Sequence, residues 1–311
     1  MNNKFFGKSY LTVDQIEKED ILYLFEKVDE MKKLVESKGG NDELKGKVLA
    51  ALFYEPSSRT FSSFLSAMQR LGGGIIPMHG MSYSSVAKGE SLRDTVKTFS
   101  CFVDILVIRN PEVGSAQEAA KYATVPVINA GDGTGEHPTQ ALQDVYTIKS
   151  HFSDIATLTV GMVGDLKNGR TVHSLTKMIL KFGVKKFVWV SPKILMMPQE
   201  IRERVEKSGG ETVEVENLND VIGDLDVMYD TRVQKERFTD LAEYERLKLA
   251  YIITPDVMKK AKKNMIVMHP LPRVGEIAYE VDRDPRAVYL TEQMRNGVFI
   301  RMALLKLILT I

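Results

Sequence analysis

The chain has 311 residues and carries 42 lysine and arginine residues against 41 aspartate and glutamate residues. This length allows a large core and predicts two domains, while the near balance of charge argues against a polyanion-binding protein, whose surface would be basic. The single cysteine, Cys101, excludes an internal disulfide and fits a reducing cytoplasm.

The composition also bears on location and metal binding. No cysteine cluster suggests a zinc site, and Cys101 falls in an apolar helical pattern, so we expect it in the core rather than as a nucleophile. The N-terminus lacks the basic-then-apolar pattern of a signal peptide, and no apolar run reaches ~18 residues. We therefore expect a soluble, cytoplasmic protein that binds neither nucleic acid nor membrane.

The first part of the chain alternates helical and strand-like patterns. Residues 14–37 place apolar side chains at helical spacing, and Gly39-Gly40 ends that helix. Short apolar runs predict strands near 47–53, 74–78, 103–108 and 125–129. Helical patterns occupy 58–71, 91–101, 114–123 and 138–151. Such alternation predicts a parallel sheet with right-handed crossovers.

A second alternating series starts near residue 157. Strands are predicted near 157–163, 186–190, 212–215, 226–229, 250–253 and 265–268. A helix is predicted near 170–182, and the apolar run at 302–309 predicts a helix at the C-terminus. The sequence therefore predicts an α/β protein of two domains, each a mostly parallel sheet flanked by helices. Ligands in such folds bind at the carboxyl ends of the strands.

The most informative motif is Phe53-Tyr54-Glu55-Pro56-Ser57-Ser58-Arg59-Thr60, where a strand-like run meets a polar turn and then a helix. Free N–H groups at a helix N-terminus favour an anion, three hydroxyls can donate to phosphate oxygens, and Arg59 adds charge and two donors. The motif therefore predicts a phosphate site, without the Gly-Lys-Ser/Thr ending of a Walker loop. Taken alone, it fits equally well a helix capped by Ser57 or Ser58 with a solvated arginine.

Six further motifs follow along the chain. They are Ala87-Lys88-Gly89-Glu90-Ser91, Ile108-Arg109-Asn110-Pro111, His137-Pro138-Thr139-Gln140, Gly164-Asp165-Leu166-Lys167-Asn168-Gly169-Arg170, Thr231-Arg232-Val233-Gln234 and His269-Pro270-Leu271-Pro272-Arg273. Together with the phosphate turn, and in this order, they resemble the catalytic chain of the aspartate carbamoyltransferases, in the aspartate/ornithine carbamoyltransferase superfamily. The resemblance covers nearly the whole length, and seven short motifs in register are jointly specific.

The resemblance implies transfer of the carbamoyl group of carbamoyl phosphate to the α-amine of L-aspartate, in pyrimidine (UMP) biosynthesis, with no cofactor and no metal. It implies a carbamoyl phosphate-binding domain of residues 1–136 and 291–311, a connecting helix at 137–152 and an aspartate-binding domain at 153–290. The C-terminal helix would pack back on the first domain. The resemblance also implies a homotrimer with shared active sites, with which separate regulatory chains can associate.

On the phosphate side, the resemblance assigns catalysis to Arg59, Thr60, Lys88, Arg109 and His137. It assigns carbamoyl phosphate binding to Ser57, Ser58, Arg59, Thr60, Ser84, Lys88, Arg109, His137, Gln140, Leu271 and Pro272. Ser82 and Ser85 compete with Ser84 for its role, and Lys88 or Arg109 taken alone would pass for a surface cation.

The residues themselves suggest some of these roles. His137 and Gln140 are three apart at the start of a helix and so project to one face. His137 could donate to the carbamoyl oxygen as negative charge develops on it, and Gln140 could accept from the carbamoyl NH₂. The Leu271 carbonyl, in a turn fixed by prolines, would be a second acceptor. His269 is expected to be structural.

On the aspartate side, the resemblance assigns substrate binding to Lys88, Arg170, Arg232 and Gln234. An arginine at a helix start, such as Arg170, opposes the helix dipole and calls for an anion, which a substrate carboxylate would supply. The residues assigned to domain closure are Lys167 and the ion pair Glu55–Arg237.

Two departures and three rival interpretations remain. Phe61 replaces an arginine that the family usually has after the phosphate turn, which puts a local ion pair in doubt, and Asn168 stands where tyrosine is common.

Ornithine carbamoyltransferases carry Ser-Met-Gly and His-Cys-Leu-Pro motifs that this chain lacks. A dinucleotide-binding module, suggested by residues 161–165, would need a third glycine. A pseudoenzyme scaffold conflicts with the intact Arg59, Lys88, Arg109 and His137.

Overall fold

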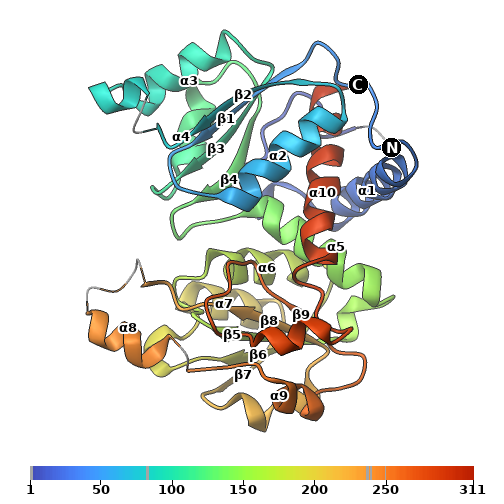
Figure 1. Ribbon diagram of the computed structural model, residues 1–311, viewed down its shortest axis with the longest axis vertical. Coiled ribbons are helices and arrows are strands. Elements are labelled where there is room, and N and C mark those ends of the chain that lie inside the picture. The colour runs from blue at the N-terminus through green and yellow to red at the C-terminus, as the bar shows by residue number, and fades with distance from the viewer. Residues whose placement is uncertain (1–2, 82–83, 236–237, 239, 249) are drawn as a thin grey trace. The chain divides into compact units, whose positions relative to one another are not determined.

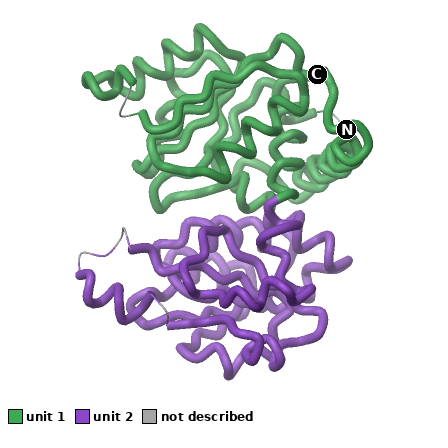
Figure 2. Tube along the Cα trace, in the orientation of Figure 1, with its two compact units in different colours: residues 1–143, 295–311 green, residues 144–294 purple. Residues whose placement is uncertain are grey.

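The computed structural model describes residues 3–81, 84–235, 238, 240–248 and 250–311. The chain divides into two compact units, which Figure 2 shows in separate colours. Unit 1 comprises residues 1–143 and 295–311, and unit 2 comprises residues 144–294. Each unit contains one parallel β-sheet with helices around it (Figure 1).

Unit 1 is built on a four-stranded sheet of order β2-β1-β3-β4, in which all the pairings are parallel. The strands are β1 (Val48–Phe53), β2 (Gly74–His79), β3 (Ile105–Asn110) and β4 (Val127–Asp132). The helices are α1 (Lys18–Lys38), α2 (Ser58–Arg70), α3 (Leu92–Ser100) and α4 (Ser115–Tyr122). β1, β3 and β4 are almost wholly buried, as expected for parallel strands covered by helices on both faces.

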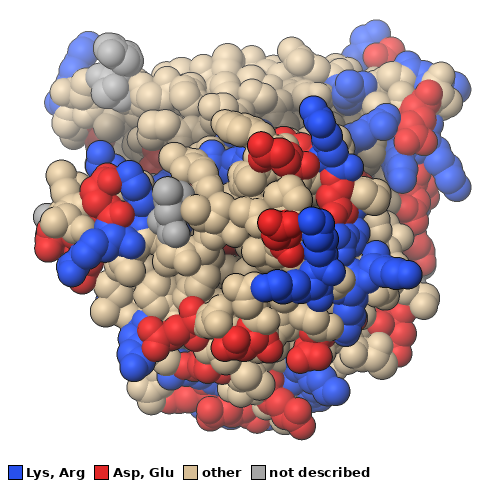
Figure 3. Space-filling view, turned by 60° about the horizontal axis from the view of Figure 1, so that its bottom comes forward, with Lys and Arg blue, Asp and Glu red and all other residues tan. Residues whose placement is uncertain are grey.

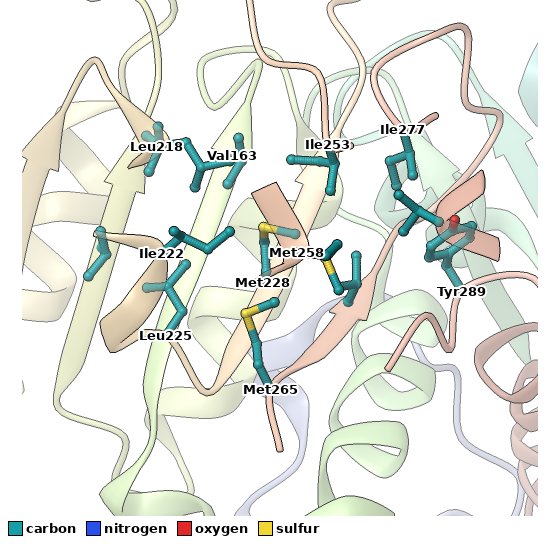
Figure 4. Close-up of a cluster of buried hydrophobic side chains, with 14 residues drawn as sticks. Val163, Leu218, Ile222, Leu225, Met228, Ile253, Met258, Met265, Ile277 and Tyr289 are labelled. Atoms are coloured by element: carbon teal, nitrogen blue, oxygen red, sulfur yellow. The ribbon is translucent and has the colours of Figure 1, made fainter. Parts of the chain in front are cut away.

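Unit 2 is built on a five-stranded parallel sheet of order β7-β6-β5-β8-β9. The strands are β5 (Thr159–Gly164), β6 (Lys186–Val190), β7 (Glu211–Val215), β8 (Val227–Thr231) and β9 (Ile266–Met268). The helices are α6 (Arg170–Leu180), α7 (Gln199–Lys207), α8 (Leu241–Leu247) and α9 (Pro255–Lys260). Figure 4 shows the core beside β8, where Val163, Met228 and Ile253 belong to one cluster of buried side chains.

Two more helices contain the boundaries between the units. α5 (Pro138–His151) passes from unit 1 to unit 2, and α10 (Glu292–Leu309) returns to unit 1. Short 3-10 helices complete the description: η1 (Val13–Gln15), η3 (Ser85–Lys88), η4 (Ile155–Thr157), η5 (Lys193–Leu195), η6 (Leu218–Asp220), η7 (Ile222–Asp224) and η9 (Tyr279–Arg283). The predicted fold class, including a C-terminal helix that belongs to the first domain, is confirmed.

Two predictions about local structure are wrong. The expected strand at 250–253 is not formed: Ile253 alone pairs, through an isolated bridge to Ile277, because its partner is a loop and not a strand. Cys101 is exposed and not in the core. It is the C-cap of α3, whose buried face is formed by Thr95, Val96 and Ser100, so Cys101 falls outside that face.

The surface agrees with the balanced composition. Figure 3 shows lysine and arginine interspersed with aspartate and glutamate on the face it draws. Among the described residues, none of the helices combines the length and the low polarity that crossing a membrane would require.

An ion pair within unit 2 joins the end of α5 to the start of α10. His151 Nε2 lies 2.7 Å from Glu292 Oε2, and the hydrogen bond that the imidazolium donates to this carboxylate raises the pKa of His151 above its ordinary value of 6.5. A raised histidine pKa means that the folded state holds the proton more tightly than the unfolded chain. The pair therefore stabilises the fold below the ordinary pKa, and this contribution is lost as the pH rises through the raised value.

We predict that His151→Asn lowers the urea midpoint of unfolding more at about pH 6 than at about pH 9, because the imidazolium is present only at the lower pH. Urea unfolding curves of the wild type and the variant at both pH values measure this. Ser150→Ala, which removes a hydrogen bond of 2.9 Å from an uncharged hydroxyl to the same carboxylate, is the control and should show no such dependence. Equal losses for His151→Asn at the two pH values would contradict the prediction.

Candidate active site

The sequence-predicted site residues of unit 1 lie at or just after the carboxyl ends of parallel strands. The phosphate turn follows β1, Arg109 lies at the end of β3, and His137 follows β4. β1 and β3 are neighbours in the sheet, as are β3 and β4. The fold therefore gathers these segments at one edge of the sheet, where ligands bind in α/β proteins.

The phosphate turn forms the N-terminus of α2. Ser57 occupies the N-cap position, but its side chain makes no capping hydrogen bond. Its backbone N–H donates to His79 Nε2 at 3.4 Å. Ser58 and Arg59 are exposed in the first turn of the helix. The first N–H groups of a helix lack partners within it and carry its positive dipole end, so this turn is suited to binding an anion.

The start of α5 lies against the start of α2. Thr60 Oγ1 and His137 Nε2 are 3.3 Å apart, and both side chains are buried. Gln140, also buried, donates its backbone N–H to the His137 carbonyl at 3.0 Å. The structure therefore brings His137, predicted from one motif, next to Thr60, predicted from another.

Arg109 is held by groups of its own unit. Its Nη1 donates to the Ala130 carbonyl at 3.3 Å, and its Nε lies 3.4 Å from Glu55 Oε2. The Arg109 side chain is 14% exposed and that of Glu55 is 21% exposed, so water screens the pair only partly. Arg109 is thus not the surface cation that its sequence position alone would allow.

Ser84 and Lys88 lie at the two ends of η3, Ser84 just before it and Lys88 as its last residue. Ser84 is the N-cap of this turn: its Oγ donates to the Met81 carbonyl at 2.6 Å and accepts from the Val86 N–H at 3.2 Å. Lys88 is the last residue of η3, its side chain is exposed, and Gly89 follows with a φ of +94°. Ser82, a competitor for the role of Ser84, lies outside the described residues.

In unit 2, a carboxylate joins two loops that follow neighbouring strands. Asp165 comes directly after β5, and its Oδ1 accepts from the Asn168 N–H at 3.0 Å. Its Oδ2 accepts from the Asn168 side-chain amide at 3.1 Å and from the Gln234 N–H at 3.3 Å. Gln234 Nε2 in turn donates to the Asn168 carbonyl at 2.9 Å. Since β5 pairs with β8, this network holds the loops of Arg170 and Arg232 side by side.

The close approach of these loops depends on Gly164. Its φ is +108°, and a Cβ at this position would lie 2.0 Å from the Thr231 carbonyl oxygen. Arg170 is the first residue of α6, and Arg232 follows β8, with Nη1 donating to the Val233 carbonyl at 3.4 Å. Lys167 is exposed in the loop before α6. This part of unit 2 therefore presents several cations, as a dicarboxylate requires.

The turn after β9 contains Leu271 and Pro272. Leu271 has a φ of +56°, in the left-handed region, and the Leu271–Pro272 peptide bond is cis. The Leu271 N–H donates to His269 Nδ1 at 2.7 Å. Arg237 lies outside the described residues, so the predicted closure pair of Arg237 with Glu55 stays a prediction.

Both halves of the chain match domains of one protein family. Residues 8–150 match the carbamoyl-P binding domain of aspartate/ornithine carbamoyltransferases, and residues 156–308 match their Asp/Orn binding domain. The chain belongs to the aspartate/ornithine carbamoyltransferase family. The resemblance inferred from the seven motifs is thereby confirmed.

Members of this family from several organisms are similar over most of this chain. Multifunctional protein pyr1-3 of Dictyostelium discoideum is 50% identical over 307 residues, which are 99% of this chain and 14% of that protein. The aspartate carbamoyltransferase catalytic subunit of Clostridium botulinum (strain Langeland) is 51% identical over 261 residues, 84% of this chain and 85% of that protein. The chain therefore spans only one segment of the multifunctional relative.

Solved structures of aspartate transcarbamoylases are similar to this chain in fold and in sequence. Aspartate transcarbamoylase from Trypanosoma cruzi, in complex with carbamoyl phosphate and aspartate, has a TM-score of 0.94 and 41% identity, covering 99% of this chain and 98% of that one. The catalytic subunit of M. jannaschii aspartate transcarbamoylase has a TM-score of 0.89 and 46% identity, covering 96% and 97%.

The two departures from the family pattern have local explanations. Phe61 packs edge-on against Phe53 at 5.1 Å between ring centroids and lies 4.8 Å from the His79 ring. Phe61 therefore makes aromatic contacts at this position. Asn168 is bonded to Asp165 and Gln234.

Sequence reasoning assigned no role to Asp165, which organises both loops of unit 2. A Gly-Asp pair directly after a predicted strand was the available signal. The sequence did not indicate that Asp165 joins the two loops, because its partner Gln234 is far away along the chain.

Proposed function

We propose that the chain is an aspartate carbamoyltransferase (EC 2.1.3.2), which converts carbamoyl phosphate and L-aspartate into N-carbamoyl-L-aspartate and phosphate. The observation that carries the proposal is the pairing, in a chain of this family, of loops that carry Arg170, Arg232 and Gln234 beside one another in unit 2. Two cationic side chains suit a substrate with two carboxylates and would repel the side chain of ornithine. The named relatives support the same substrate.

The phosphate would bind at the N-terminus of α2, through Ser57, Ser58, Arg59 and Thr60. Each hydrogen bond to a charged group contributes about 1.5–3 kcal/mol, so several such donors would hold a dianion firmly. Arg109 and Lys88 would add charge at the phosphate and the carbamoyl oxygen. Ser84 is proposed as a further phosphate ligand.

His137 would donate to the carbamoyl oxygen as negative charge grows on it. The contact of Thr60 with His137 supports this role, because it couples the imidazole to the phosphate turn. Gln140 and the Leu271 carbonyl would accept from the carbamoyl NH₂, with Pro272 shaping the turn. The amide would then be oriented from two sides.

The reaction would proceed by direct attack of the α-amine nitrogen on the carbamoyl carbon. The new C–N bond forms, the C–O bond to the phosphate breaks, and the leaving phosphate takes the proton from the amine. Catalysis would rest on proximity, orientation and stabilisation of the developing charge. Arg170 and Arg232 would bind the two carboxylates, assisted by Gln234 and Lys88.

Domain closure is proposed to complete the site. Lys167 would then contact the substrate side, and Glu55 would pair with Arg237. In the described structure Glu55 lies instead against Arg109. The anionic phosphate would compete with Glu55 for Arg109 and so release it for a new partner.

We further propose that the product feeds pyrimidine (UMP) biosynthesis in the cytoplasm. The assembly would be a homotrimer with shared active sites, to which regulatory chains can bind. The names of two relatives as catalytic subunits support an assembly of more than one chain.

We predict that the purified protein forms N-carbamoyl-L-aspartate and phosphate, and that replacing L-aspartate by L-ornithine abolishes the release of phosphate beyond the slow decomposition of carbamoyl phosphate. The physical reason is the cationic pair Arg170 and Arg232. The measurement is carbamoylated product by mass spectrometry alongside phosphate release. Equal or faster turnover of ornithine would disprove the assignment.

We also predict that two inactive variants, Lys88→Ala and His137→Ala, restore part of the activity when they are dissociated, mixed and reassembled. If Lys88 acts across the subunit interface, a mixed trimer contains some sites in which both residues are intact. The readout is turnover per trimer, with each variant reassembled alone as the control. Mixed trimers without activity would place Lys88 in its own chain's site or in none.

A further inference from the structure

A cluster of three titratable side chains is buried behind the Leu271 turn of unit 2. His269 is 0% exposed, Asp230 is 1% exposed and Glu276 is 4% exposed. Buried ionisable groups are costly unless they are hydrogen-bonded or paired, so they call for a structural or functional reason. The proposed chemistry uses none of the three directly.

His269 and Glu276 hold both ends of the turn between them. His269 Nδ1 accepts from the Leu271 N–H at 2.7 Å, so the imidazole has an unprotonated nitrogen on that side. Its Nε2 lies 2.9 Å from Glu276 Oε1, so the imidazole and the carboxylate form a close buried pair. Glu276 Oε2 accepts from the Val274 N–H at 2.7 Å. One imidazole–carboxylate pair therefore binds two backbone N–H groups of residues 269–276.

Both His269 and Glu276 are also hydrogen-bonded through their backbones to other parts of unit 2. The His269 N–H donates to Gln293 Oε1 at 3.0 Å, and Gln293 Nε2 donates to Asp144 Oδ1 at 2.8 Å. On the other side, the Ile253 N–H donates to the Glu276 carbonyl at 2.8 Å. The next residue, Ile277, belongs to the hydrophobic core, as Figure 4 shows. The turn is thus fixed against a buried polar network and a packed core.

Leu271 needs such support because its φ of +56° is unfavourable for a residue with a side chain. A left-handed residue that is not glycine persists only where its surroundings hold it there. The hydrogen bond from its N–H to His269 is one such constraint. Because this backbone conformation also sets the direction of the Leu271 carbonyl, the hydrogen bond to His269 helps to orient that carbonyl.

The two carboxylates of the cluster differ in state. Burial, and then the charge of Glu276, raise the pKa of Asp230 well above its ordinary value. Burial alone would raise the pKa of Glu276 as well, but the interaction with His269 and the backbone N–H groups that face the carboxylate bring it below the ordinary value. His269 Nε2 is 4.0 Å from Asp230 Oδ2, too far for a hydrogen bond. Negative charge is therefore more favourable on Glu276 than on Asp230.

We propose that His269 and Glu276 are positioning residues of the transferase: they orient the Leu271 carbonyl so that it accepts from the carbamoyl NH₂. This role rests on the proposed function. It makes a specific distinction between two ligands. Carbamoyl phosphate uses both the phosphate turn and the Leu271 carbonyl, whereas inorganic phosphate uses the phosphate turn alone.

Glu276→Gln tests the proposal because the amide keeps the shape of the side chain but has only one acceptor oxygen. It cannot accept from both Val274 and His269, so the turn loses a constraint. We expect the Kd of carbamoyl phosphate to rise about tenfold, the equivalent of one hydrogen bond, with the Kd of inorganic phosphate unchanged. Asp230→Asn, an equally buried exchange of the same atoms, is the matched control and should change neither Kd nor turnover.

Calorimetric titration of both ligands into each variant gives the result, with thermal melting to check the fold. Unchanged carbamoyl phosphate affinity in folded Glu276→Gln, or equal weakening of the binding of both ligands, would overturn the proposal.

If Glu276→Gln does not fold, the variants His269→Asn and His269→Gln replace it as the test. The asparagine oxygen can take the place of Nδ1 as acceptor for Leu271, so His269→Asn should bind carbamoyl phosphate more tightly than His269→Gln, and the reverse order would overturn the proposal.

The experiments distinguish failure of the proposed function from failure of the positioning role. A wild-type protein that forms no N-carbamoyl-L-aspartate refutes the proposed function, and the positioning role falls with it. An active wild type whose Glu276→Gln variant binds both ligands normally refutes the positioning role alone.

Discussion

The cations that would bind the phosphate and the two carboxylates repel one another, and the proposed function depends on how the fold manages this repulsion. The chain as a whole has a formal net charge of only +1, so the positive charge has to be local. Arg59 and Arg109 belong to unit 1, while Arg170 and Arg232 belong to unit 2. Within unit 1, Glu55 lies 3.4 Å from Arg109 and neutralises part of that charge. Anionic substrates would supply the remaining compensation.

The loops that carry these cations are positioned by parallel sheets. A parallel sheet brings the carboxyl ends of all its strands to one edge, and short loops there can be held by few contacts. In unit 2, Asp165 performs this task for two loops by accepting from the Asn168 N–H, the Asn168 side-chain amide and the Gln234 N–H. Behind the sheet edge, Asp144 accepts from Gln293 at 2.8 Å and from the Tyr229 hydroxyl at 2.9 Å. Buried carboxylates thus provide the acceptors that fix the loops.

Most elements of the fold could be predicted from the sequence because parallel strands buried on both faces produce short continuous apolar runs. β1 and β5 are such runs, and both lie within two residues of their predicted bounds. The expected strand at 250–253 is also apolar but pairs at Ile253 alone. Composition identifies a segment that can be buried, whereas pairing depends on a partner that the local sequence does not contain.

The motifs identified the site residues more readily than the contacts between them. His137 and Thr60 belong to separate motifs, and only the sheet order brings them to 3.3 Å. The network of Asp165, Asn168 and Gln234 depends on β8 lying beside β5, which the order of elements along the chain does not reveal. His269 was expected to be structural, and its bond to Leu271 gives that expectation a specific form.

The assignment of Arg232 to L-aspartate, and not to carbamoyl phosphate, is the central claim, and Arg232→Ala tests it most directly. The measurements are the KM for L-aspartate and the calorimetric Kd for carbamoyl phosphate, with Arg283→Ala, an exposed arginine of the same unit, as the control. Loss of a hydrogen-bonded charge at about 1.5–3 kcal/mol predicts that the KM for aspartate rises roughly 10- to 100-fold, while the Kd for carbamoyl phosphate changes less than about twofold. Equal weakening of both substrates would contradict the account.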